Sequence, residues 1–253
     1  MRIIALANEK GGSGKTTTAV NLSACLAEKG KRTLLIDLDP QSASSRWLRK
    51  EDEAGQLLDA FTGGVKLADL VQNVGPNLDM IPSSRRLGTA DGVFPFDTNP
   101  KTIMARAFKE LPKKWDYVLC DCPPNLGVLT LGALSAVQEV LITCEAHYLA
   151  MQGLVDITDT IDKVTGSSNP ALKIAGIVVC RADYRTNHTK EIIEQLRGAF
   201  GKQVLKSVIR ENIRLAECPA YGFHILDYHQ YCNGAEDYRS LAKEIIKQTK
   251  RSK

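Results

Sequence analysis

A glycine-rich stretch near the start of the chain carries residue types that bind phosphate groups. Residues 8–17 read NEKGGSGKTT, with Lys15 directly after the last glycine and a second lysine, Lys10, before the first. In a phosphate-binding loop, backbone N–H groups and the N-terminus of the following helix surround the anionic oxygens. Lys15 then contacts the terminal phosphates, and the Thr16 hydroxyl is a ligand for Mg²⁺. The stretch therefore predicts a site for a polyphosphate and its Mg²⁺.

This loop differs from the usual phosphate loop in two ways. The usual pattern is G-x-x-x-x-G-K-[ST], and here Glu9 stands in the place of its first glycine. Lys10 is hard to use within the same protomer, because Lys15 already occupies the position next to the terminal phosphates. The alternative interpretation is a glycine-rich turn beside two solvated lysines, and the strand–loop–helix context argues against it.

Carboxylates follow two other apolar runs of the sequence. Asp37 and Asp39 stand in DLDPQ, and Asp121 follows the run 117–120. Carboxylates at the carboxyl ends of parallel strands face the ligand crevice, and the shared parity of Asp37 and Asp39 lets both point toward the loop. The alternative for this pair is capping of the next helix. Asp121 has the form of the aspartate that holds Mg²⁺ in phosphoryl-transfer proteins.

Short apolar runs alternate with helix-length segments and must position these residues. Runs of this kind, bounded by turn residues, suit strands that are buried on both faces of a parallel sheet. The pattern predicts a doubly wound, mostly parallel α/β sheet with helices on both faces. The expected strands are 3–7, 33–38, 78–81, 117–120, 140–143, 174–179 and 204–209, and the expected helices are 16–29, 101–111, 149–164, 189–200 and 235–248.

The bulk properties are those of an ordinary globular chain. Its 253 residues are 43% hydrophobic and 25% charged, which favours a single domain over 1–253, with 51–100 as the least regular part and 250–253 as a frayed basic tail. The seven cysteines, without a signal-like start, favour a cytoplasmic location and buried free thiols over disulfides or an iron–sulfur cluster. No apolar run approaches the length of a membrane span.

The motif K-G-G-x-G-K-[ST] resembles the deviant phosphate loop of the ParA/Soj/MinD ATPases. PPNLGVLTLGAL (123–134) is similar to the second switch segment of that family, and CEAHYLAMQG (144–153) is similar to its interface segment. The resemblance runs from Met1 to about Ile246 and fits the short ParA/Soj group that lacks an N-terminal helix-turn-helix domain. It implies a P-loop ATPase whose cofactors are ATP and Mg²⁺.

The resemblance also implies roles for individual residues. Lys10 crosses a two-fold interface to the partner's nucleotide, so that the ATP-bound protein is a homodimer, and it acts in catalysis with Lys15 and Asp39. Asp39 orients or deprotonates the attacking water. Thr16, Asp37 and Asp121 serve the Mg²⁺ ion. The nucleotide-binding residues are Lys10, Gly11, Gly12, Ser13, Gly14, Lys15, Thr16, Thr17 and Arg210.

Basic residues outnumber acidic ones between residues 173 and 214, a region in which the family holds duplex DNA. DYRTNH resembles the family's DARTNL, which implies a DNA-binding role for Arg185, and Arg214 matches a second basic position. Glu211, Phe223 and Tyr231 stand where basic residues are common. We therefore expect weaker, non-specific DNA binding. The alternative is a solvated basic face.

The overall implication is a partition or positioning ATPase with slow hydrolysis, located in the cytoplasm on the nucleoid. A ParB-like or cargo-adaptor protein would stimulate it. One alternative is a MinD-like ATPase on a membrane, but the apolar stripe near the C-terminus contains no aromatic residue and is explained more simply by core packing. The other alternative is a P-loop metabolic enzyme, for which no separate substrate constellation is visible.

Overall fold

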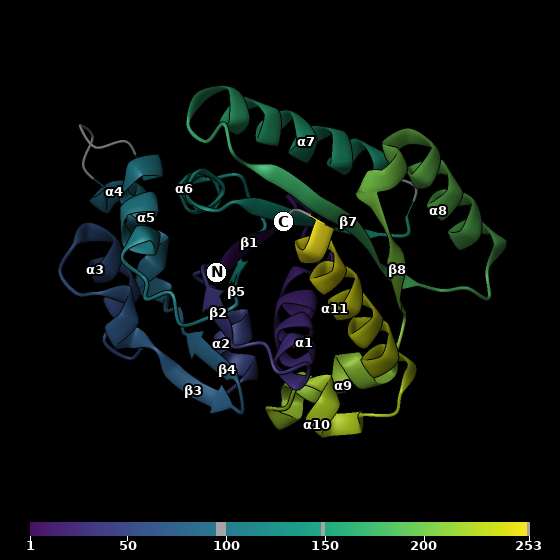
Figure 1. Ribbon diagram of the computed structural model, residues 1–253, viewed down its shortest axis with the longest axis horizontal. Helices are drawn as coiled ribbons and strands as arrows, with labels where there is room; N and C mark the ends of the chain where they lie inside the picture. Colours follow the sequence, from purple (N-terminus) through teal and green to yellow (C-terminus); the bar gives the residue numbers. More distant parts are fainter. Residues whose placement is uncertain (95–99, 148–149, 252–253) are drawn as a thin grey trace.

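A computed structural model describes residues 1–94, 100–147 and 150–251, and its centre is an eight-stranded sheet of order β3-β4-β2-β5-β1-β6-β7-β8 (Figure 1). All neighbouring strands are parallel except β3 and β4, which pair antiparallel at one edge. The strands are β1 (Arg2–Ala7), β2 (Thr33–Asp37), β3 (Gln72–Gly75), β4 (Leu78–Ile81), β5 (Tyr117–Asp121), β6 (Glu139–Glu145), β7 (Lys173–Ala182) and β8 (Val204–Arg210).

Central strand β1 lies between β5 and β6 and is buried on both faces. Its residues alternate between two hydrophobic cores: Ile3 and Ala5 join one, and Ile4 and Leu6 join the other. This alternation is the period of two that a strand imposes, and a strand apolar on both faces is suited only to the middle of a parallel sheet. The loop that follows β1 is therefore held at the centre of the sheet's carboxyl edge.

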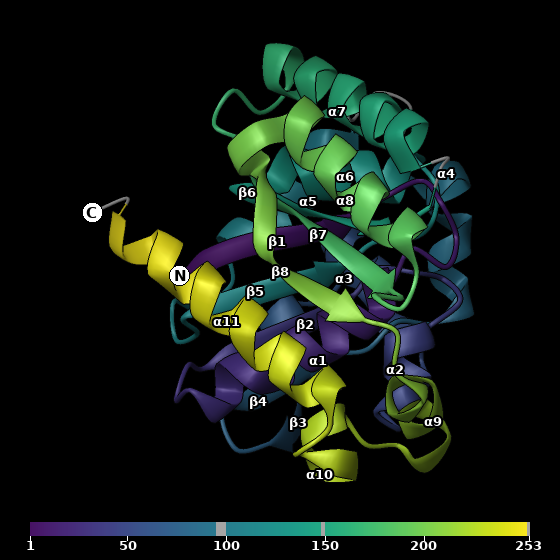
Figure 2. The same cartoon turned by 90° about the vertical axis from the view of Figure 1, so that its right-hand side faces the viewer.

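Helices cover both faces of the sheet. One core contains α1 (Lys15–Glu28) and α11 (Asn233–Arg251), and Figure 2 shows α11 alongside α1 and β8. The short helices α2 (Ala43–Trp47), α9 (Ile213–Tyr221) and α10 (Ile225–His229) join this face. The other face carries α3 (Gln56–Thr62), α4 (Ala90–Val93), α5 (Pro100–Lys109), α6 (Val128–Ala136), α7 (Ala150–Ser167) and α8 (Asn187–Phe200).

The predicted doubly wound α/β sheet is confirmed, and each predicted strand is present with shifts of a few residues at its ends. Each predicted helix is present as well, and α1 ends just before Gly30, whose φ is +71°. The first residue of the predicted helix 149–164 lies outside the described residues. The predicted core packing of the last helix is confirmed, because Leu241, Ala242 and Ile245 are buried.

Several elements were missed by the sequence prediction, each for a local reason. The sequence of α6, VLTLGALSA, is apolar all round and shows no helical period. A proline, Pro219, lies inside α9 and argues against a helix there. The edge strand β3 is short and polar. Within the segment expected to be least regular, residues 51–94 form short elements, η1 (Leu67–Leu70) and η2 (Arg85–Thr89) among them; residues 95–99, like 252–253 of the predicted tail, lie outside the described residues.

The cysteines lie in the interior, as predicted. Six of the seven are buried as free thiols, and Cys232 is half-buried. Burial raises the pKa of each of those six thiols, because the thiolate would have to leave water. They behave as small hydrophobic side chains of the core.

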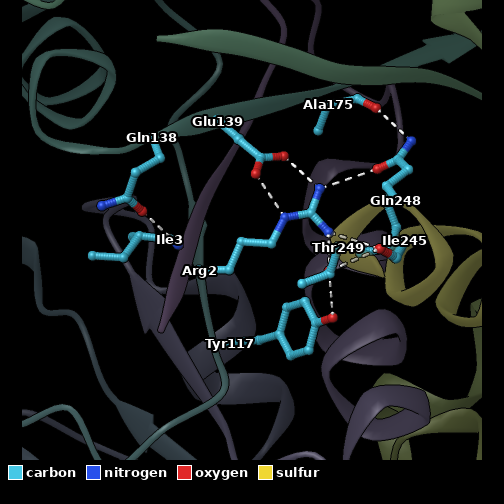
Figure 3. Close-up of polar contacts among 9 residues, drawn as sticks. All are labelled: Arg2, Ile3, Tyr117, Gln138, Glu139, Ala175, Ile245, Gln248 and Thr249. Carbon is cyan, nitrogen blue, oxygen red and sulfur yellow. Dashed lines mark hydrogen bonds and ion pairs between the residues drawn. The ribbon is translucent and has the colours of Figure 1, made fainter. Parts of the chain in front are cut away.

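A polar cluster around Arg2 ties the C-terminal helix to the first residues of β1 and β6 (Figure 3). The Arg2 guanidinium donates to Glu139 Oε1 (2.6 Å), to the carbonyl of Ile245 (2.7 Å), to Thr249 Oγ1 (2.9 Å) and to Gln248 Oε1 (3.0 Å). Both charged side chains are largely removed from water, with exposures of 12% and 20%. The cluster therefore joins β1, β6 and the last turns of α11 through one cation.

Removing the Arg2 side chain should destabilise the protein. The substitution Arg2→Leu leaves Glu139 partly buried without its cation, which we expect to lower the free energy of unfolding by ~2 kcal/mol. Urea denaturation measures this value. The control is Arg197→Leu, since Arg197 forms an exposed pair with Glu194 on α8, and its loss should change stability by less than ~0.5 kcal/mol. Equal losses in the two variants would contradict this view of the cluster.

Candidate nucleotide site

The loop between β1 and α1 has the backbone geometry of a phosphate cradle. Gly12 and Gly14 have φ values of +78° and +88°, a region that side chains rarely adopt. Gly14 precedes the first residue of α1, and no side chain caps the helix there. A Cβ on Gly14 would lie 3.2 Å from the Cβ of Cys180 on β7. The amides of the first turn of α1 are thus directed at the loop, as anion binding requires.

Hydrogen bonds to β6, the neighbour of β1 in the sheet, hold this loop in place. Asn8 donates through Nδ2 to the carbonyl of Thr143 on β6 (2.5 Å) and accepts the N–H of Lys10 through Oδ1 (3.0 Å). The hydroxyls of Ser13 and Thr143 are 3.1 Å apart. Tyr238 of α11 lies 3.2 Å from the Thr18 hydroxyl in the first turn of α1. The loop is therefore anchored at both of its ends.

Lys15 is a buried cation inside the loop. Its Nζ donates to the backbone carbonyl of Lys10 (3.1 Å), and its side chain faces the acids at the strand ends. Burial lowers the pKa of Lys15, and the negative charges of Asp121 and Asp39 oppose this shift. Within the described residues its one acceptor is a neutral carbonyl, which phosphate oxygens can replace.

Asp37 and Asp121 lie next to each other at the ends of β2 and β5, where their backbones pair in register. Both are completely buried. Asp37 accepts the N–H of Asp39 (3.0 Å), and it accepts both the N–H (2.9 Å) and the hydroxyl (2.6 Å) of Ser45. Burial raises the pKa of Asp37, and these hydrogen bonds limit the shift. Both of its oxygens are therefore committed to local partners.

Asp121 is different, because neither of its carboxylate oxygens has a hydrogen-bond partner among the residues that the structure describes. Burial, followed by the charge of Asp37, raises the pKa of Asp121 to about 8, although the nearby hydroxyls of Thr16 and Ser44 lower it. An unpartnered buried carboxylate beside a threonine hydroxyl suits a hard divalent cation. The residues present therefore fit Mg²⁺, with Asp121 and Thr16 as the groups that would hold it.

A cavity of about 1020 Å³ opens beside the loop and is large enough for a nucleotide. Gly11, Lys15, Thr16 and Asp39 line one side, and the ends of β7 and β8 line the other. Asp39 accepts the N–H of Gln41 through Oδ1 (2.9 Å) and is 9% exposed. The two aspartates of DLDPQ thus have different surroundings, since Asp39 faces the cavity and Asp37 faces Ser45.

The predicted arginines lie in three different settings. Arg185 and Arg210 line the cavity, and Arg210 is paired with Asp237 through Nη2 and Oδ1 (2.7 Å). Arg214 lies on α9, where its Nη1 donates to Glu217 (2.9 Å). Within the described part of the chain, Arg214 is not among the residues that line this cavity. The structure therefore groups Arg185 with the nucleotide-binding residues and separates Arg214 from them.

Two residues at this edge of the sheet were missed by the sequence prediction. Glu145 ends β6, and Arg181 lies near the end of β7 and lines the cavity. The rule that identified Asp37 and Asp121, a polar residue after an apolar run, applies equally to both. Tyr238 carried no comparable signal, because it lies inside an ordinary helical pattern.

The chain is similar to known proteins over nearly its whole length. A family model described as an AAA domain matches residues 1–174. The chromosome partitioning protein ParA of Myxococcus xanthus is 38% identical over 97% of this chain and 88% of its own length. The sporulation initiation inhibitor protein Soj of Bacillus subtilis is 38% identical over 96% of this chain and 98% of its own. The chain belongs to the ParA/Soj family of ATPases.

Solved structures share the fold of this chain. Cobyrinic acid a,c-diamide synthase from Mycobacterium smegmatis, with bound ADP and magnesium, superposes with a TM-score of 0.87 at 28% identity, over 100% of this chain and 96% of that one. The septum site-determining protein MinD of Pyrococcus horikoshii, with Mg-ADP, has a TM-score of 0.79 at 24% identity, over 98% of this chain and 97% of that one, and shows the fold alone. This ParA/Soj protein is an ATPase, and its cofactors are ATP and Mg²⁺.

None of the helices of this ParA/Soj protein within residues 1–94, 100–147 and 150–251 combines the length and apolarity needed to cross a bilayer.

Replacing Asp121 by Asn should stabilise the protein in EDTA while abolishing its stabilisation by MgATP. The folded protein holds the Asp121 proton up to about pH 8, whereas the unfolded chain loses it at ~4. Wild-type stability therefore falls as the pH rises through this window, by as much as ~1.4 kcal/mol per pH unit. The gain in unfolding temperature of Asp121→Asn should grow over the same window. Thermal denaturation in EDTA at several pH values measures it.

The matched control for this experiment is Asp162→Asn, an exposed position on α7. The unfolding temperature of this variant should not rise relative to the wild type as the pH increases. A stabilisation of Asp121→Asn that stayed constant with pH would show that the carboxylate does not carry a displaced pKa.

Proposed function

We propose that this protein is a partition or positioning ATPase that pairs around two molecules of MgATP and separates again after hydrolysis. The observation that carries the proposal is the placement of Lys10. Its Nζ lies 3.1 Å from Glu145 at the rim of the loop, and its side chain is 42% exposed. The lining of the cavity begins at Gly11 and contains Lys15 instead. Lys10 is therefore a cation available at the surface beside a site that already has its own lysine.

The same geometry supports roles for the other residues. In our proposal Lys15 neutralises the β- and γ-phosphates, and the loop amides of Gly11, Gly12, Ser13 and Gly14 bind their oxygens together with Thr17. Thr16 and Asp121 hold Mg²⁺, which neutralises charge on the transferring phosphoryl group. Asp39, which faces the cavity, orients the attacking water. Asp37 supports the ion indirectly, because its oxygens already bind Ser45 and Asp39.

Mixing two inactive variants tests whether Lys10 of one protomer acts on the ATP bound to the other. Lys10→Ala lacks the cation offered to the partner, and Asp39→Ala lacks the water-orienting carboxylate. In a mixed dimer, the ATP on the Lys10→Ala protomer has an intact Asp39 and receives Lys10 from the other chain. Random pairing makes half of the dimers mixed, with one restored site each, so ATPase activity should return to roughly a quarter of the wild-type rate.

The controls are the two variants assayed alone, which should both be inactive, and a mixture of Lys10→Ala with a Lys10→Ala/Asp39→Ala double variant, which should also stay inactive. Formation of mixed dimers is checked with two different affinity tags. Inactive mixtures in which mixed dimers are present would show that Lys10 does not act across an interface.

We further propose that the ATP-bound form binds duplex DNA weakly and without sequence preference. Arg185 is 85% exposed at the mouth of the cavity, but its guanidinium binds Asp183 through two hydrogen bonds of 2.7 and 2.8 Å. This pair raises the pKa of Arg185, and the charge of Glu211 adds to the shift. A DNA phosphate must therefore compete with Asp183 and approach Glu211, which supports a lower affinity than a free arginine would have.

Charge changes at this mouth should alter DNA binding in opposite directions. Arg185→Ala should reduce the affinity for all sequences alike and lower the salt slope of log K by about one. Glu211→Arg should raise the affinity and steepen that slope. Fluorescence anisotropy with ATP over a range of salt measures both. The control is Lys113→Ala. Lys113 is exposed and precedes β5, so it lies at the ends of the strands opposite to the cavity. A wild-type protein that binds no DNA at low salt would refute this part of the proposal.

The relatives support a class of partner. Two of them, at 36–38% identity over nearly the whole chain, are named chromosome partitioning proteins, which supports a ParB-like or cargo-adaptor activator and a cytoplasmic location on the nucleoid. The likeness to cobyrinic acid a,c-diamide synthase favours a second candidate, a P-loop metabolic enzyme. ATP turnover that depends on a small carboxylic acid rather than on an activator protein would identify that candidate.

A further inference from the structure

Glu145 forms ion pairs with two cations at the rim of the phosphate loop. Its Oε2 accepts from Lys10 Nζ at 3.1 Å, and its Oε1 accepts from Arg181 Nη1 at 2.5 Å. The carboxylate is only 17% exposed, whereas the side chains of Lys10 and Arg181 are 42% and 59% exposed. The carboxylate is thus a fixed, half-buried anion, and the two cations are its more mobile partners.

The backbone of Arg181 is held in an unusual conformation. Its φ is +52°, in the left-handed region that a non-glycine residue adopts only with backbone strain. Arg181 lies beside Glu145 because Cys180 pairs with Glu145 across β6 and β7. Strain of this kind persists only where surrounding contacts maintain it, and the ion pair with Glu145 is such a contact.

We propose that Glu145 restrains Lys10 within its own protomer, and that Arg181 retains the Glu145 carboxylate when Lys10 leaves it for the partner's nucleotide. Glu145 and Arg181 are thus positioning residues for Lys10. This inference rests on the proposed crossing of Lys10 to a second copy of the chain, and it adds the residues that control that crossing.

Electrostatics explains why the second cation is needed. If Lys10 left an otherwise unpaired Glu145, a half-buried negative charge would stand beside the arriving phosphates and repel them. Arg181 keeps that carboxylate neutralised, so that Lys10 arrives as a net positive charge. When Lys10 leaves, Glu145 therefore loses one of its two ion pairs and keeps the other, instead of losing its only one.

A second contact links this restraint to the nucleotide of the same protomer. Lys15 Nζ donates to the backbone carbonyl of Lys10 at 3.1 Å. Phosphate oxygens in the cavity would compete for that donor and release the carbonyl. Binding of ATP in one site therefore loosens the backbone of Lys10, and only Glu145 then restrains its side chain.

Opposite effects of two substitutions on pairing test the inference. Glu145→Gln keeps the shape and removes the restraint, whereas Arg181→Gln leaves Lys10 as the only cation on Glu145. A half-buried ion pair changes an equilibrium by roughly threefold, and a dimer contains two of them, so each effect should be about tenfold. With AMP-PNP and Mg²⁺, the dimer dissociation constant should fall about tenfold in Glu145→Gln and rise about tenfold in Arg181→Gln. Analytical ultracentrifugation measures both.

The combination of the two changes separates this mechanism from a general loss of charge. In the Glu145→Gln background, Arg181→Gln should have almost no effect, because there is no carboxylate left to neutralise. Arg181→Lys should keep a dissociation constant close to that of the wild type. The control Arg197→Gln removes another exposed, paired arginine, on α8 and far from the loop, and should change nothing. If Arg181→Gln weakened pairing equally in both backgrounds, the proposal would be wrong.

A monomer measurement distinguishes failure of this inference from failure of the proposed function. Without nucleotide, the rate at which Lys10 reacts with an amine-directed ester, followed by mass spectrometry against exposed Lys113, should rise several-fold in Glu145→Gln. An unchanged rate would refute the restraint itself, whatever Lys10 does in the dimer. If the rate rises but Lys10→Ala pairs as well as the wild type, the proposed crossing of Lys10 is wrong, and this inference fails with it.

Discussion

Two carboxylates buried side by side at the ends of β2 and β5 are the constraint on which the site depends. Hydrogen bonds from Ser45 and Asp39 satisfy Asp37, whereas Asp121 has no hydrogen-bond partner in the described part of the chain and its pKa is raised to about 8. Such a pair opposes folding when it is charged, and it gains most from a cation. The metal site therefore destabilises the free protein, and binding of MgATP stabilises it. Folding and ligand binding are thus thermodynamically linked.

Unlike Asp121, each of the cations around the cavity already has a hydrogen-bond acceptor in its own chain. Lys15 binds a backbone carbonyl, and the others bind carboxylates: Lys10 and Arg181 bind Glu145, Arg185 binds Asp183 and Arg210 binds Asp237. An anionic ligand must exchange with these acceptors rather than fill open positions. Exchange of this kind lowers affinity, because part of the new interaction replaces an old one. It also links each binding event to a movement of the protein's own side chains.

The C-terminal helix supports the site from a distance. Tyr238 in α11 contacts Thr18 in the first turn of α1, and the far end of the same helix is held by Arg2 of β1. Both contacts lie close to the β1–α1 unit that carries the phosphate loop, so α11 acts as a brace along it. The rigid sheet, the two packed helices and the glycine geometry together hold the loop amides in place before any phosphate arrives, which is the condition for strong anion binding.

The sequence by itself determined the elements that depend on neighbours along the chain. The phosphate loop, the apolar strands, the amphipathic helices and the acids Asp37, Asp39 and Asp121 could all be predicted, because local spacing defines each of them. It could not separate Asp39, which faces the cavity, from Asp37, which faces Ser45, since both share one strand parity. It also did not predict the contact between Lys10 and Glu145, which are 135 residues apart, or the contact between Thr18 and Tyr238, which are 220 apart. Only the tertiary structure decided these contacts, because strand order and register determine which distant side chains meet at the carboxyl edge of the sheet.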